Sequence, residues 1–162
     1  MRIFDYFLSN YLYLIDSGLK NFTKFENLII ESISEALKNT EVNISDLRTL
    51  LVISSTKGNI NLLEAEPMSQ ELRNRISLST SAQKISDYFG HRNKPVVVSN
   101  ACISGLSGLL FAKRMIQSGQ YDNAIVTGSD LITRFVFSGF DSFKALSNSL
   151  VLTNKVSLPE MT

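Results

Sequence analysis

The pattern of apolar and polar positions along the chain predicts helices and strands in turn. Residues 23–38 place apolar side chains on one face at helical spacing, and Thr23 with Glu26 forms a capping box at the start. Residues 49–54 (TLLVIS) are a continuous apolar run of strand length, typical of a strand buried on both faces of a parallel sheet. Residues 4–15 have no clean period and fit an early helix or strand equally well.

After a polar stretch over residues 62–79, the pattern predicts two helices and two buried strands. In chain order they are residues 81–89 (helix), 95–99 (strand), 104–118 (helix) and 123–128 (strand). Glycines follow both helices, and Gly119 stands where a left-handed C-cap residue belongs. The last strand, helix and strand make one βαβ unit, so the predicted fold class is α/β. Because no linker-like segment divides the chain, we expect residues 1–162 to form a single domain.

Composition excludes several classes of function. The 162 residues include 16 Lys and Arg against 15 Asp and Glu, and a net charge of +1 gives no electrostatic footprint for nucleic acid or an anionic membrane. One cysteine and one histidine allow no internal disulfide and predict no metal site. No apolar run reaches the ~18–20 residues of a membrane span, and the first residues lack the basic region and cleavage site of a signal peptide. These features favour a cytoplasmic globular protein.

The candidate for chemistry is Cys102, in the turn SNACISG over residues 99–105. This turn joins a buried strand to a helix, and free amides at a helix N-terminus favour the nucleophilic thiolate and can hold an oxyanion. The small neighbours Ala101, Ser104, Gly105 and Gly108 leave room for a substrate. The alternative is an ordinary buried cysteine, which spacing alone favours.

A base for Cys102 is not evident. His91 precedes it by eleven residues and belongs to the far end of the intervening strand, so we expect an exposed loop histidine. Residues 56–59 (TKGN) follow a strand but lack the glycines of a phosphate loop, which favours a simple turn.

Two features later in the chain also have alternative interpretations. Asp130 follows the third strand at the end where α/β sheets bind ligands, although a turn or cap role is favoured. A phenylalanine cluster fits an acyl pocket, with core packing the favoured alternative. Its members are Phe135, Phe137, Phe140 and Phe143.

Residues 96–105 (VVVSNACISG) and 123–130 (NAIVTGSD) resemble the β-ketoacyl synthases, the condensing enzymes of the thiolase fold. Residues 139–140 (GF) and 145–147 (ALS) also match motifs of that family, and the resemblance is strongest over residues 49–148. Residues 51–60 are similar, less specifically, to a bacterial subgroup tied to aryl-polyene or flexirubin-type pigments. The resemblance implies the N-terminal half of a thiolase-like fold, with a mainly parallel buried sheet and helices on both faces.

The same resemblance implies a reaction. Cys102 would accept an acyl group from acyl carrier protein as a thioester. That thioester would condense with decarboxylated malonyl carrier protein in fatty acid, polyketide or aryl-polyene synthesis. The Cys102 amide would be one oxyanion donor, and Ala101, Gly105 and Phe140 would contact substrate. No metal or cofactor is implied.

Members of that family are more than twice as long, and their two catalytic histidines lie in the C-terminal half. The resemblance therefore implies an N-terminal half that pairs with a second synthase half, or forms a homodimer through the strand at residues 95–99. A monomer whose strand edge is protected by Arg92 and Lys94 is the alternative to association. The alternatives to catalysis are a half-synthase that only binds acyl chains or a partner, and an unrelated α/β domain with a structural cysteine.

Overall fold

The computed structural model describes residues 19–145, which form helices around a parallel sheet. Its three strands are arranged in the order β2, β1, β3, and both neighbours of β1 run parallel to it. In chain order the elements are α2 (Lys24–Leu37), β1 (Thr49–Ser54), the 3-10 helix η1 (Ile60–Glu64), α3 (Gln70–Ile76), α4 (Leu78–Tyr88), β2 (Val96–Val98), α5 (Ser104–Gln117), β3 (Asn123–Gly128) and α6 (Arg134–Ser142).

The chain divides into two compact units, Met1–Leu131 and Ile132–Thr162. Of the described residues, the first unit contains the sheet with α2 to α5, and the second contains α6. That residues 1–162 form a single domain stays a prediction.

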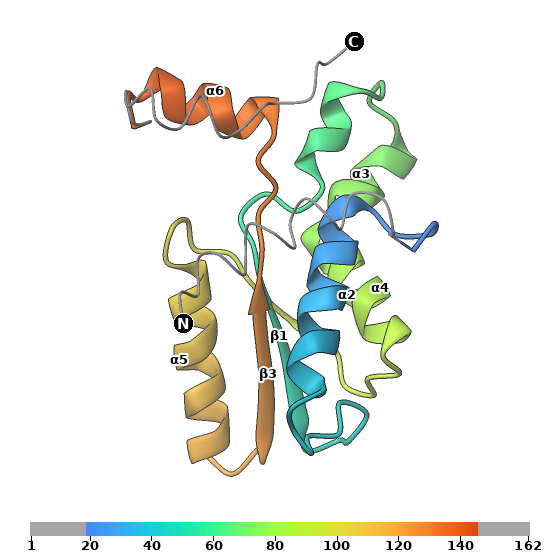
Figure 1. Cartoon of the computed structure of the whole chain (residues 1–162), viewed down its shortest axis with the longest axis vertical. Helices are drawn as coiled ribbons and strands as arrows, with labels where there is room; N and C mark the ends of the chain where they lie inside the picture. The colour runs from blue at the N-terminus through green and yellow to red at the C-terminus, as the bar shows by residue number, and fades with distance from the viewer. Residues whose placement is uncertain (1–18, 146–162) are drawn as a thin grey trace. The chain divides into compact units, whose positions relative to one another are not determined.

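The central strand β1 is buried on both faces because helices cover each side. Alternate side chains of a strand point to opposite faces, so Leu51 and Ile53 pack on one side, and Leu50 and Val52 on the other. Figure 1 shows α2 and α4 on one side of the sheet and α5 on the other. The first core also includes Phe25, Ile29, Ile33 and Ile85, and the second includes Ala112.

A buried polar network fixes the start of α2. The capping box predicted from Thr23 and Glu26 is present in both directions. The Glu26 carboxylate, although almost fully buried, also accepts hydrogen bonds from Asn59 at 3.2 Å and from Ser81 at 2.9 Å. Lys84 lies 3.4 Å from the same carboxylate. The buried Glu26 carboxylate therefore has the hydrogen-bond donors and the nearby cation that compensate for its removal from water.

The predicted α/β class, the parallel sheet and the helices on both faces are confirmed, and the strands at residues 49–54 and 123–128 have the predicted bounds. Three elements were not predicted: η1, which runs into the polar stretch, α3 within that stretch, and α6. The expectation that the strands at residues 95–99 and 123–128 are buried is wrong for most of their positions. They are only half-buried because they lie at the two edges of the sheet.

The close packing of α5 on the sheet can be tested by substitution of Gly108. A Cβ at Gly108 would lie 2.6 Å from Ser54 Oγ, whereas a Cβ at Gly105 would have no atom within 4 Å. We expect Gly108→Ala to lower the free energy of unfolding by about 1–3 kcal/mol despite the better helix propensity of alanine. The control Gly105→Ala should leave stability unchanged or raise it by up to about 1 kcal/mol. Urea denaturation measures both, and equal effects would contradict the close approach.

Candidate functional site

Cys102 lies in the connection between β2 and α5, just before the helix begins. β2 ends at Val98, Ile103 is the N-cap residue of α5, and Cys102 precedes this cap. Its side chain is exposed. The alternative of an ordinary buried cysteine is therefore wrong, and the thiol is accessible to a reagent or a substrate.

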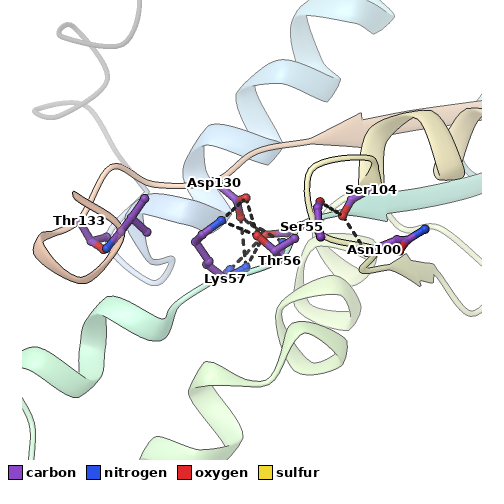
Figure 2. A network of polar contacts seen from close by, with 10 residues as sticks. Ser55, Thr56, Lys57, Asn100, Ser104, Asp130 and Thr133 are labelled. Carbon is purple, nitrogen blue, oxygen red and sulfur yellow. Dashed lines mark hydrogen bonds and ion pairs between the residues drawn. The ribbon is translucent and has the colours of Figure 1, made fainter. Parts of the chain in front are cut away.

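The turn that carries Cys102 is fixed by its own side chains (Figure 2). Ser104 Oγ accepts a hydrogen bond from the Asn100 amide at 2.8 Å and donates one to the Ala101 carbonyl at 2.7 Å. Asn100 Nδ2 donates to Ser107 Oγ at 3.1 Å. Ala101 has a φ of 45°, a left-handed conformation that a residue with a Cβ seldom adopts. Such strain is maintained only where the surrounding structure determines it, and here it directly precedes Cys102.

The other predicted substrate-binding residues differ in where they lie. Ala101 and Gly105 are exposed beside Cys102, on either side of the helix start. Phe140 is on α6 in the other compact unit, where its ring is exposed. The substrate contact of all three residues stays a prediction.

His91, the only histidine of the chain, is not the exposed loop residue that the sequence suggested. It is buried, and its Nδ1 lies 2.6 Å from the carbonyl oxygen of Ile44. His91 precedes β2 whereas Cys102 follows it, so the two residues belong to opposite ends of this strand. The expectation that His91 is no base for Cys102 agrees with this placement.

The carboxyl ends of β1 and β3 are joined by Asp130, as Figure 2 shows. One carboxylate oxygen accepts hydrogen bonds from Ser55 Oγ at 2.7 Å and from the amides of Thr56 and Lys57 at 3.2 Å each. The other accepts from Thr56 Oγ1 at 2.8 Å and lies 3.1 Å from Lys57 Nζ. The sequence indicates residues 56–59 and Asp130 separately, but not that they bind each other. The available signal was that both follow neighbouring parallel strands.

This network of hydrogen bonds determines the direction in which the pKa of Asp130 is shifted. Burial alone would raise the pKa of Asp130, but the hydrogen bonds from Ser55, Thr56 and Lys57, with the Lys57 charge, outweigh it and lower that pKa. The amides of Thr56 and Lys57 therefore form a small anion-binding nest that the protein's own carboxylate occupies. The favoured interpretations of residues 56–59 as a turn and of Asp130 as its cap agree with this geometry.

The phenylalanine cluster is exposed, so the expectation of core packing is wrong for these residues. The members are Phe135, Phe137, Phe140 and Phe143, and Phe143 is 84% exposed. The physical reason is that neither hydrophobic core cluster of the described residues includes a residue of α6 or Phe143. The acyl-pocket interpretation stays a prediction.

Two further observations concern the described part of the chain alone. Within residues 19–145, no group of three or more His, Cys, Asp or Glu residues could hold a metal ion. Among the helices described there, none is long and apolar enough to cross a membrane.

Comparison with solved structures identifies the fold to which the parallel sheet belongs. Two solved ketosynthases share the fold. The oxazolomycin ketosynthase domain of Streptomyces albus JA3453 matches 69% of this chain and 21% of its own, with a TM-score of 0.55 and 20% identity. A ketosynthase from Xenorhabdus doucetiae, in complex with its chain length factor, matches 75% of this chain and 32% of its own, with a TM-score of 0.52 and 22% identity. The fold is thus the N-terminal part of a thiolase-like ketosynthase fold.

Sequence relatives give the family. Residues 14–157 match the family described as beta-ketoacyl synthase, N-terminal domain, so the chain belongs to the β-ketoacyl synthases. A highly reducing polyketide synthase from Didymella fabae is 29% identical over an alignment of 129 residues, and the match covers 76% of this chain and 7% of that protein. The chain spans less than a third of the length of each of these three relatives.

The lowered pKa of Asp130 predicts how stability depends on pH. Asp130→Asn should lower the free energy of unfolding at pH 7, because the amide has one acceptor oxygen instead of two and no charge opposite Lys57. A carboxyl whose pKa is lower in the folded state stabilises above its unfolded pKa, about 3.9, and the contribution is lost as pH falls through the folded value. The difference between wild type and variant should therefore be full at pH 5–7 and shrink toward pH 3. Urea denaturation across this range measures it, and a difference that grows toward acid would refute the assignment.

Proposed function

We propose that Cys102 is the nucleophile of a β-ketoacyl synthase and accepts an acyl group as a thioester. The observation that carries this proposal is an exposed thiol in a hydrogen-bonded, strained turn directly before α5. Membership of the β-ketoacyl synthase family supports it, since that family makes carbon–carbon bonds through an acyl-cysteine. The polyketide synthase relative favours polyketide-type over fatty acid substrates.

The proposed transfer uses atoms of this turn. The Cys102 thiolate attacks the carbonyl carbon of an acyl carrier protein thioester, and the Cys102 amide donates a hydrogen bond to the oxyanion that forms. Collapse of this intermediate breaks the carbon–sulfur bond to the carrier, whose thiolate leaves and takes a proton. Ala101 and Gly105 contact the acyl group nearest the sulfur.

In the second step, malonyl carrier protein loses carbon dioxide and its carbanion attacks the Cys102 thioester, which releases a 3-oxoacyl product and the free thiolate. Preorganised donors must stabilise the charge on the malonyl carbonyl during this loss. The single histidine, His91, is buried and bonded to the backbone, so we assign these donors to a second synthase half.

Acyl transfer to Cys102 can be tested directly, because the chain has one cysteine. Incubation of the folded chain with an acyl-N-acetylcysteamine thioester should add the mass of one acyl group, and hydroxylamine should remove it. Cys102→Ala should gain no acyl group. Ser118→Ala, a conservative change at the other end of α5, should be acylated like wild type. Intact-mass spectrometry measures the adduct, and its absence from a folded wild-type sample would refute the nucleophile.

A non-catalytic half-synthase that binds a partner is the second candidate, and the exposed face of α5 favours it. Several large apolar side chains on this helix are exposed, namely Leu106, Leu109, Leu110 and Ile116. Leu106, Leu109 and Leu110 are neighbours at helical spacing, and exposed apolar side chains gathered on one face usually mark an interaction site. The solved ketosynthase from Xenorhabdus doucetiae is in complex with its chain length factor, which supports a synthase-like partner. Both candidates therefore require association.

We propose that this face of α5 packs against a second thiolase-like half, in a separate chain or in a second copy. Leu106→Glu with Leu109→Glu should convert an associated species to an 18.1 kDa monomer, because burying two unpaired carboxylates costs several kcal/mol. Glu31→Lys changes the charge at an exposed position of α2, which covers the other face of the sheet (Figure 1), and should leave association intact. Light scattering at micromolar concentration measures the mass. A wild-type monomer, both alone and with a chain length factor, would refute this interface.

A further inference from the structure

The ends of all three strands are connected at the carboxyl edge of the sheet, and β1 provides the connections. The amide of Ser55, directly after β1, donates to the carbonyl of Val98 at the end of β2, at 3.2 Å. The carbonyl of Ser54 accepts a hydrogen bond from the amide of Ser129, after β3, at 3.3 Å. Ser55 is therefore bonded to the end of β2 through its backbone and to Asp130 through its hydroxyl.

We propose that Asp130 is a positioning residue for Cys102, acting through Ser55 on the end of the strand from which the Cys102 turn begins. The inference rests on the proposed role of Cys102 as nucleophile and adds a residue to it. Asp130 itself touches neither the thiol nor the substrate in this assignment. Its carboxylate holds residues 55–57 in their conformation, and the amide of Ser55 is bonded to the end of β2.

A carboxylate is the side chain that the loop requires. Five donors converge on Asp130: the hydroxyls of Ser55 and Thr56, the amides of Thr56 and Lys57, and the Lys57 ammonium. An amide at position 130 would place its NH2 group against some of these donors, and alanine would leave all five without this acceptor. In the alanine variant the Ser55 hydroxyl loses this acceptor, and in the asparagine variant the loop must rearrange around the NH2 group.

The same pair of strands has a second aspartate clamp at its opposite end, which provides a matched control. Asp122, directly before β3, accepts two hydrogen bonds from Arg48, directly before β1, at 2.9 and 2.6 Å. Both aspartates join β1 to β3 beside a basic side chain, but only Asp130 lies at the end where β2 leads into Cys102. If the variants acted only by lowering stability, loss of either aspartate would change the reactivity of Cys102 to a similar extent. If Asp130 positions Cys102, only loss of Asp130 should change that reactivity.

The experiment measures the rate of Cys102 alkylation by iodoacetamide between pH 6 and 9.5, in the whole chain, at a temperature where circular dichroism shows every variant folded. We expect Asp130→Asn and Ser55→Ala each to reduce the rate at pH 7 at least threefold and to move the midpoint of the pH profile upward. Asp122→Asn should match wild type within a factor of 1.5. Acetate should restore part of the rate of Asp130→Ala, because it can occupy the vacated nest.

Ser55→Ala separates positioning from charge. Loss of the Asp130 charge leaves Lys57 unbalanced, which alone would favour the thiolate and raise the alkylation rate. Ser55→Ala changes no charge, so a fall in rate there supports positioning. An unchanged or raised rate in Asp130→Asn, or an equal fall in Asp122→Asn, would overturn the proposal.

Acyl transfer from the N-acetylcysteamine thioester is measured on the same variants. If wild type gains no acyl group while Asp130→Asn and Ser55→Ala still slow alkylation, the proposed function fails and the positioning stands. If wild type is acylated but alkylation is unaffected by Asp130→Asn, the positioning fails alone.

Discussion

Burial of β1 on both faces is the constraint on which the rest of the structure depends. Its side chains Leu50, Leu51, Val52 and Ile53 are all almost inaccessible to solvent, and each contributes about 1.5–3 kcal/mol by leaving water. A strand buried in this way needs a strand on each edge and helices on each face, which β2, β3 and the flanking helices provide. The close approach at Gly108 follows from the same constraint, because α5 must lie near enough to cover Val52.

The central position of β1 also determines where chemistry can occur. Parallel strands bring their carboxyl ends to one edge, so the loops after β1, β2 and β3 meet there. One of these loops contains an exposed cysteine, and the other two contain a lysine and an aspartate that bind each other. The Asp130 carboxylate occupies the nest formed by the amides of Thr56 and Lys57, whereas the Cys102 thiol at the same edge is exposed.

The sequence predicts those features that are local or periodic. The bounds of β1 and β3 follow from apolar runs, the start of α2 from its capping box, and the end of α5 from Gly119, whose φ is 72°. Position in the sheet is a property of the tertiary structure, which is why β2 and β3 were expected to be buried but are half-buried edge strands.

In the candidate site, too, some features follow from the local sequence and others depend on the tertiary structure. Cys102 could be found from its strand–turn–helix setting and family resemblance, but the left-handed Ala101 could not, since alanine rarely adopts that conformation. The pairing of Asp130 with residues 55–57 joins positions about 75 residues apart, which no local pattern reports. The buried His91 likewise has its hydrogen-bond partner, the Ile44 carbonyl, 47 residues away in the chain.

The buried network around Glu26 has a consequence for how the chain folds. Its donors come from Thr23, Asn59 and Ser81, three segments that meet only when α2, the loop after β1 and α4 have all docked. An intermediate with α2 docked alone would bury this carboxylate without Asn59 and Ser81, and a buried charge that lacks partners is unfavourable. Docking of these three segments should therefore be a single cooperative event, and partly assembled forms of this face should be sparsely populated.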